Sequence, residues 1–194
     1  MKTIIATDFD GTLTTRDTLL EFVRFTKGDM QFLLGLLLFS PLLILMKLHL
    51  YPNYKSKQKL FSYFFRGMSL EEFNCLGRSF AAANSHLLRE GGVRMIEEAR
   101  SSGAEVVVIS ASIDNWVQPF FPDLRVIGTQ AEVQDGLLTG RFSSKNCYGQ
   151  EKINRLLEVF PDRSNYFLVA YGDSKGDRKL LAFADERHFK PWRD

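Results

Sequence analysis

Two aspartates stand two positions apart near the start of the chain, where a short apolar segment meets a glycine. Residues 3–7 are apolar or β-branched, which is typical of a buried strand in a parallel sheet, and Asp8, Asp10 and Gly11 follow. Alternate strand residues point the same way, so we expect both carboxylates at the carboxyl end of this strand. One carboxylate can attack phosphorus there while the other handles the proton of the leaving group. The alternative interpretation is a plain Asp-Gly turn.

A second apolar segment ends in small polar residues. Residues 105–109 predict another buried strand, and Ser110, Ala111 and Ser112 follow it. A hydroxyl and backbone N–H groups at such a strand end can hold a phosphate oxygen.

A third strand and one lysine complete the set of candidate residues. Residues 166–171 predict the strand, and the loop after it supplies Asp173 and Asp177. Lys152 lies near the start of a helical pattern between these segments. On its own it would be interpreted as a solvated surface lysine.

Together these segments resemble the haloacid dehalogenase-like hydrolase superfamily. Its four short motifs occur here in order, at residues 8–14, Ser110, Lys152 and residues 172–177. The resemblance spans nearly the whole chain and implies an α/β fold, with a doubly wound parallel sheet and an inserted helical cap domain. Dehalogenases of the superfamily lack an acid at the position of Asp10, so the resemblance favours phosphatase chemistry.

The resemblance also implies a role for each residue. Asp8 would be the nucleophile that forms an aspartyl-phosphate, and Asp10 would protonate the leaving oxygen and then activate water. Mg²⁺ is implied as the cofactor, with Asp8, Asp173 and the backbone carbonyl of Asp10 as ligands. Asp177 would bind or orient the metal, although an acid there can also stabilise a helix N-terminus. The residues implied to bind the substrate phosphate are Ser110, Ala111 and Lys152.

An insertion interrupts the expected core. The pattern after the first motif is mostly helical, with interruptions at Gly28 and Pro41 and with a capping box that begins at Ser69. Asp135 and Gly136 predict the turn of a hairpin farther along. A helical cap at this place occurs in the branch that includes phosphoserine phosphatase, where it closes over the site and excludes water. The predicted boundaries are residues 1–14 and 92–194 for the core and residues 15–91 for the cap.

The chain departs from phosphoserine phosphatases at several motif positions. Gly11 stands where that family typically has Ser. Ala111 and Ser112 replace its two glycines in the second motif, and Gly176 replaces its Asn before the last acid. Asp17 occupies the place of the acid that binds the substrate amine, a possible substrate contact, but we favour its interpretation as a helix N-cap. Phosphoserine therefore becomes a less favoured substrate.

The cap contains a stretch, residues 32–46, that is more apolar than a small cap needs. As a helix it would span about 22 Å, short of the ~30 Å bilayer core, so shallow insertion into one leaflet fits better than a simple span. No acidic residue occurs between Asp29 and Glu71, a charge pattern that suits a surface facing anionic lipid. The insertion resembles that of phosphatidylglycerophosphatases of the C type. The basic residues that follow the stretch are Lys47, Lys55, Lys57, Lys59 and Arg66.

These observations predict a Mg²⁺-dependent phosphomonoester hydrolase, with a membrane lipid headgroup phosphate such as phosphatidylglycerophosphate as substrate. We expect it in the cytoplasm, peripheral on the inner face of the membrane and without a nucleic-acid partner. One alternative is a soluble phosphatase of small metabolites. Another is a noncatalytic phosphoaspartate receiver, which Asp10 and the long cap disfavour. Residues 32–46 could equally form the buried core of the cap or a homodimer contact.

The charge, the cysteines and the N-terminal segment give no sign of a disulfide, a metal-binding cysteine motif or a signal peptide. The net charge is +2, and Cys75 and Cys147 have no spacing that indicates a disulfide, a zinc site or a redox motif. No signal peptide is expected, because no cleavable apolar stretch precedes the first strand at Thr3.

Overall fold

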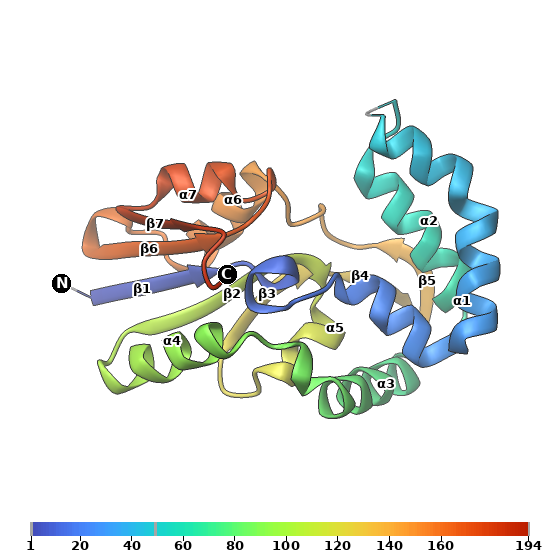
Figure 1. The fold of residues 1–194 in the computed structure, drawn as a ribbon, viewed down its shortest axis with the longest axis horizontal. Coiled ribbons are helices and arrows are strands. Elements are labelled where there is room, and N and C mark those ends of the chain that lie inside the picture. Colours follow the sequence, from blue (N-terminus) through green and yellow to red (C-terminus); the bar gives the residue numbers. More distant parts are fainter. Residues whose placement is uncertain (1, 49, 194) are drawn as a thin grey trace.

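The computed structural model describes residues 2–48 and 50–193, apart from the side chains of Leu43 and Lys47. A five-stranded parallel sheet with helices on both faces forms one lobe, and a group of helices stands beside the carboxyl ends of its strands as a second, helical lobe (Figure 1). The predicted α/β class with a doubly wound parallel sheet is confirmed.

The strand order of the sheet is β3-β2-β1-β6-β7, and every pair is parallel. The chain leaves β1 towards β2 and later returns to its other side with β6, so the order reverses beside the carboxyl end of β1. Ligands bind at such reversal points in open α/β sheets. The strands are β1 (Lys2–Thr7), β2 (Glu105–Ile113), β3 (Arg125–Thr129), β6 (Tyr166–Gly172) and β7 (Glu186–Phe189).

Two pairs of helices cover the sheet. Figure 1 shows α4 (Glu90–Ser101) and the short α5 (Asp114–Val117) on one side, with α6 (Gln150–Val159) and α7 (Arg178–Phe183) on the other. The β2 strand is longer than predicted, because it continues past a register shift between Ile109 and Ile113. The motif residues after position 109 therefore lie on an irregular strand end.

The helical lobe contains α1 (Thr18–Lys47), α2 (Asn53–Phe65) and α3 (Leu70–Ala83). The backbone of α1 leaves helical geometry at Gly28, as the sequence predicts, but the helix continues through Pro41. Proline cannot donate to the carbonyl one turn earlier, which here is that of Leu37. The Ser40 hydroxyl donates to this Leu37 oxygen at 2.8 Å and replaces the missing bond. The break predicted at Ser40-Pro41 is therefore wrong.

The start of α3 is as predicted, and its end is not. Ser69 accepts a hydrogen bond from the Glu72 backbone N–H at 3.1 Å, which confirms the N-cap. The helix stops at Ala83 instead of running towards Leu88, because Leu88 forms a β-bridge with Thr14. The two connections between the lobes thus pair with each other.

The predicted hairpin is confirmed, but its surroundings differ from the expectation. Asp135 and Gly136 both have positive φ, the turn geometry that joins two twisted strands, β4 (Ala131–Gln134) and β5 (Leu137–Phe142). The hairpin stays outside the main sheet. Leu138 instead exchanges backbone hydrogen bonds with Gly67 and Met68 of the helical lobe, at 2.8 and 2.9 Å.

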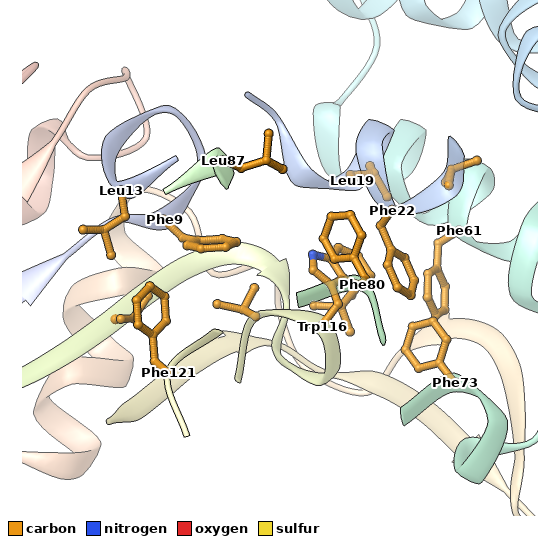
Figure 2. Packing of buried hydrophobic residues seen from close by; sticks show 14 of the residues in the cluster. Phe9, Leu13, Leu19, Phe22, Phe61, Phe73, Phe80, Leu87, Trp116 and Phe121 are labelled. Carbon is orange, nitrogen blue, oxygen red and sulfur yellow. The ribbon is translucent and has the colours of Figure 1, made fainter. Parts of the chain in front are cut away.

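One aromatic core joins the two lobes (Figure 2). Phe22 of α1 stacks on Trp116 of α5, with ring centroids 4.9 Å apart, and Phe73 and Phe80 of α3 pack edge-on against Phe22. The Trp116 indole N–H also donates to the Thr18 hydroxyl at 3.2 Å. The first turns of α1 are thereby fixed to the sheet lobe.

The second half of α1 leaves a row of apolar side chains exposed. Met30, Leu37 and Leu38 are 76%, 71% and 60% exposed. The spacing of three and four residues places this row on one face of the helix, while Phe39 packs on Tyr63 of α2. Among the described helices, none combines the length and apolarity that a membrane span requires. We call this row the apolar ridge: Met30, Leu33, Leu34, Leu37, Leu38, Ile44, Leu45 and Leu48.

Candidate active site

Asp8 lies at the reversal point of the sheet, directly after β1. Its backbone N–H donates to the Tyr171 carbonyl of β6 at 3.0 Å, which fixes the strand end. The side chain is buried, with 6% of the residue exposed. Gly11 has a φ of +78°, and a Cβ at this position would lie 2.7 Å from a carboxylate oxygen of Asp173. A glycine is therefore required for the turn to close against the acid of the fourth motif.

The Lys152 ammonium sits between two buried carboxylates. It donates to Asp8 Oδ1 at 2.6 Å, to Asp177 Oδ1 at 2.7 Å and to the Ile109 carbonyl at 2.8 Å. These three bonds use all three ammonium hydrogens, and Lys152 is only 1% exposed. The interpretation of Lys152 as a solvated surface lysine is thereby wrong.

Charge and burial shift the pKa values of these groups in opposite directions. Burial raises the pKa of Asp8 to about 7, and the neighbouring carboxylates Asp177 and Asp10 add to the rise, while Lys152 opposes it. Burial alone would lower the pKa of Lys152, but the two carboxylates raise it overall. Burial also opposes ionisation of Asp177, yet its bonds with Lys152 and Ser174 lower its pKa. Lys152 and Asp177 are therefore a stable ion pair.

Asp8, Asp173 and Asp177 form a cluster whose ligand atoms lie within 4.8 Å of one another. Three carboxylates offer the hard oxygen donors that Mg²⁺ prefers, and their mutual repulsion calls for a cation. Asp177 already uses one oxygen for Lys152 and the other for Ser174, whose hydroxyl donates at 2.7 Å. Asp177 therefore suits the orienting role predicted for it, and Asp8 and Asp173 remain the predicted direct ligands.

The Asp10 carboxylate points towards the helical lobe and stays outside this cluster. The Thr18 backbone N–H and hydroxyl donate to Oδ1 at 2.7 and 2.6 Å. The Ser112 hydroxyl donates to Oδ2, and the Ser110 hydroxyl lies 3.4 Å from the same oxygen. Only the backbone carbonyl of Asp10 was assigned to a metal from the sequence. The side chain is held beside Asp8 and free of the cluster, as an acid or base requires.

The second motif lines the floor of a cavity of about 560 Å³ beside Asp8. Ser110 is fully buried and accepts a hydrogen bond from the Ser112 backbone N–H at 3.0 Å. Ala111 lines the cavity, and its carbonyl accepts from the Thr129 hydroxyl of β3 at 2.9 Å. These bonds hold the backbone of the strand end in place.

Asp17 contributes both to α1 and to the cavity wall. It accepts from the Leu19 and Leu20 backbone N–H groups at 3.0 and 3.4 Å, so the predicted N-cap is confirmed. Burial and the nearby Asp10 raise its pKa. The capping bonds occupy one of its oxygens, Oδ1.

Three residues of the site were not foreseen. Thr12 has its hydroxyl 3.3 Å from oxygens of both Asp8 and Asp173, and Thr18 holds Asp10. Arg193, near the chain end, pairs with Asp173 and donates to the Gly11 carbonyl at 2.9 Å. The Asp-Gly-Thr pattern could have indicated Thr12, whereas no local signal marks Arg193.

Both the sequence and the fold match known proteins. The family model described as haloacid dehalogenase-like hydrolase matches residues 5–182. Protein CicA of Caulobacter vibrioides is 34% identical over 198 residues, which cover 98% of this chain and 86% of that protein.

The structural matches are more distant in sequence. A protein of unknown function from Bordetella pertussis Tohama I has a TM-score of 0.83 at 16% identity, over 96% of this chain and 89% of that one. A phospho-aspartyl intermediate analogue of phosphoserine phosphatase has a TM-score of 0.65 at 20% identity, over 96% of this chain and 85% of that one. At these identities the structural matches show a shared fold.

Proposed function

The chain belongs to the haloacid dehalogenase-like hydrolase family, and from this premise we propose that it hydrolyses phosphate monoesters through a phosphorylated Asp8. The observation that carries the proposal is the position of Asp8, buried beside the cavity, paired with Lys152 and clustered with the two acids of the fourth motif. Asp10 is held beside it by Thr18. A structural neighbour, phosphoserine phosphatase, is represented by a phospho-aspartyl intermediate analogue, which supports the same covalent route.

Two displacements at phosphorus complete the proposed reaction. A carboxylate oxygen of Asp8 attacks phosphorus and the bond to the leaving oxygen breaks, while Asp10 gives that oxygen its proton. Asp10 then takes a proton from water, which attacks the same phosphorus and releases inorganic phosphate from Asp8. Lys152 lies against Asp8 Oδ1, so Oδ2 is the freer nucleophile. Lys152 also offsets negative charge near the reacting group. Bound Mg²⁺, held by Asp8 and Asp173, would supply further positive charge at the phosphoryl group.

Turnover of p-nitrophenyl phosphate tests this function directly. We expect hydrolysis with Mg²⁺, loss of hydrolysis in EDTA, and no turnover by Asp8→Asn. A receiver domain would become phosphorylated without turning over. Sustained wild-type turnover in EDTA would contradict the metal assignment, and full activity of Asp8→Asn would contradict the covalent route.

We further propose that the substrate is a phosphate monoester on the headgroup of a membrane lipid. The apolar ridge of α1 supplies an exposed surface for acyl chains, and Lys55, Lys59 and Arg66 lie exposed on α2 or at its end. Each basic residue near an anionic surface contributes about 1 kcal/mol to binding. Leu36 and Met46 of α1 line the catalytic cavity itself. Apolar surface therefore continues from the helical lobe into the site.

Vesicle binding tests this assignment. The protein should co-sediment with phosphatidylglycerol vesicles more than with phosphatidylcholine vesicles, and salt should weaken binding because exposed charges are screened. The double change Leu37→Asp and Leu38→Asp should release it, because carboxylates are costly in hydrocarbon. The change Val133→Asp, at an exposed apolar residue of β4, is the matched control. A protein that ignores anionic vesicles, and forms a dimer that the double change dissociates, would replace the lipid proposal with a dimer contact.

A further inference from the structure

Ser56, in the second turn of α2, carries a buried hydroxyl that the protein does not use. The residue is 2% exposed, and among the described residues its Oγ has no hydrogen-bond partner. A helical serine often bonds the carbonyl one turn earlier, which here is that of Pro52. That carbonyl instead accepts the backbone N–H groups of Lys55 and Ser56, at 3.1 and 3.3 Å. Leaving a buried hydroxyl unpaired is costly, so a group from outside the chain is its natural partner.

Ser56 lines the catalytic cavity beside two other polar residues of α2. Asn53, Ser56 and Lys57 all line the cavity. Their spacing of three and four residues from Asn53 puts them on one face of the helix. Lys57 is half-buried, and within the described part of the chain it forms no ion pair. The first turns of a thirteen-residue helix add a favourable field for negative charge.

The two polar parts of the cavity differ in charge. The floor carries the carboxylates that would receive the phosphoryl group and its metal, whereas the α2 wall carries a cation and an unpaired hydroxyl. Arg16 and Asp17 also line the cavity, and the charge of Lys57 lowers the pKa of the Asp17 carboxyl. Apolar side chains also line the wall around these groups. They are Leu19, Leu20, Leu36, Met46 and Leu60.

We propose that Ser56 and Lys57 form a second anion subsite that binds an acidic oxygen group on the leaving group of the substrate. The Ser56 hydroxyl donates a hydrogen bond to that group, and the Lys57 ammonium supplies the charge. This inference rests on the proposed phosphomonoesterase function and narrows its substrate class. Preferred substrates carry two anionic groups, the phosphate monoester and either a carboxylate or a phosphodiester, joined by an apolar or neutral spacer.

A matched set of alkyl phosphates tests the subsite. The alkyl chain has one length and ends in a methyl group, a carboxylate or a methyl phosphodiester. The readout is the ratio of kcat/KM for each acidic substrate to that for the methyl substrate, since a ratio cancels general damage to the fold. Wild-type protein should favour at least one acidic substrate. The more favoured of the two shows whether the subsite binds a carboxylate or a phosphodiester. Ser56→Ala and Lys57→Met should each lower that ratio about 10- to 100-fold, the range of a charge-assisted hydrogen bond.

Two controls separate recognition from structural effects. Lys57→Arg should keep the preference because it keeps the charge. Lys145→Met removes an exposed lysine that does not border the cavity, and should leave both the ratio and the activity unchanged. Equal ratios for all three substrates in wild-type protein, or an unchanged ratio in Ser56→Ala and Lys57→Met, would overturn the subsite.

Calorimetric binding of the corresponding phosphonates separates this inference from the proposed function, because it needs no turnover. The acidic phosphonate should bind about tenfold more tightly than the methyl one, and Lys57→Met should remove the difference. If wild-type protein binds with this preference but hydrolyses none of the substrates, the phosphatase function fails and the subsite stands. If it hydrolyses them but binds both phosphonates equally, the subsite is wrong and Ser56 is merely hydrated.

Discussion

Replacing Lys152 with Met should destabilise the protein strongly, and more so at neutral than at acidic pH. The ammonium is the shared partner of Asp8 and Asp177, which are 6% and 1% exposed. Removing one partner of a buried ion pair costs about 3–5 kcal/mol, because the remaining charge stays buried. For a chain of this size that loss lowers Tm by about 6–20 °C. Methionine keeps most of the apolar stem, so an empty cavity contributes little.

The pH dependence identifies the cause of the loss. In wild-type protein the pKa of Asp177 is lower in the folded state than in the unfolded state. Its ionised carboxylate therefore stabilises the fold at pH values above the unfolded-state pKa, and this stabilisation is lost as the pH falls through the folded-state pKa. Without the ammonium, burial raises the pKa of Asp177 and lifts that of Asp8 above its already raised wild-type value of about 7. The folded variant therefore binds protons more readily than the unfolded chain. The stability of the variant therefore rises as the pH falls through the raised pKa values, and the difference in stability between wild type and variant becomes smaller.

Thermal unfolding in EDTA at pH 7.5 and 5.5 measures both effects. Lys145→Met, at an exposed lysine, is the control and should melt with wild-type protein. A Tm of Lys152→Met within about 2 °C of wild type at pH 7.5 would refute the reasoning, since that shift corresponds to less than about 1 kcal/mol. A difference in Tm between wild type and variant that grows on acidification would also refute it.

The remaining predictions concern the acids and the thiols. Asp10→Asn should lower kcat about 10²- to 10⁴-fold at an unchanged Tm, the range of general acid-base catalysis, and a loss below tenfold would contradict its role. Asp173→Ala should weaken Mg²⁺ binding in calorimetry, because it removes one of the two carboxylates proposed to hold the metal; an unaltered affinity would place the metal elsewhere. A thiol reagent should modify exposed Cys75 in the folded protein and reach Cys147 only after unfolding, because burial shields that thiol and raises its pKa to about 11. Rapid modification of both thiols in the native state would contradict the packing around Cys147.

The arrangement of Asp8 and Asp173 at one edge could be anticipated because each follows a strand of a parallel sheet, and such strand ends meet at one edge. Lys152 lies on a helix, and only the family resemblance placed it beside them. The same logic fails for Arg193. Its position depends on Trp192, which stacks on Tyr171 with centroids 5.1 Å apart, a contact between residues that no local pattern links.

The helical lobe was harder to predict in its details. Helical periodicity indicates that helices form, but it does not show that α1 continues through Pro41, where the Ser40 hydroxyl donates to the Leu37 carbonyl that proline leaves without a donor. The hairpin was foreseen from its turn residues. Its attachment to Gly67 and Met68 was not, because backbone hydrogen bonds between distant segments leave no mark on side-chain type. The unpaired hydroxyl of Ser56 likewise follows from three-dimensional packing, since its sequence neighbours are ordinary helix residues.

The stack of Phe22 on Trp116 determines whether the helical lobe can be separated from the sheet lobe. An inserted unit with its own core can be deleted, transplanted or unfolded separately from its host. Here the insert and the host bury their largest side chains in each other, so neither retains a complete interior alone. We expect a single cooperative unfolding transition for the chain. A deletion of residues 15–91 would leave Trp116 and Leu138 uncovered and yield an aggregation-prone fragment instead of a minimal hydrolase.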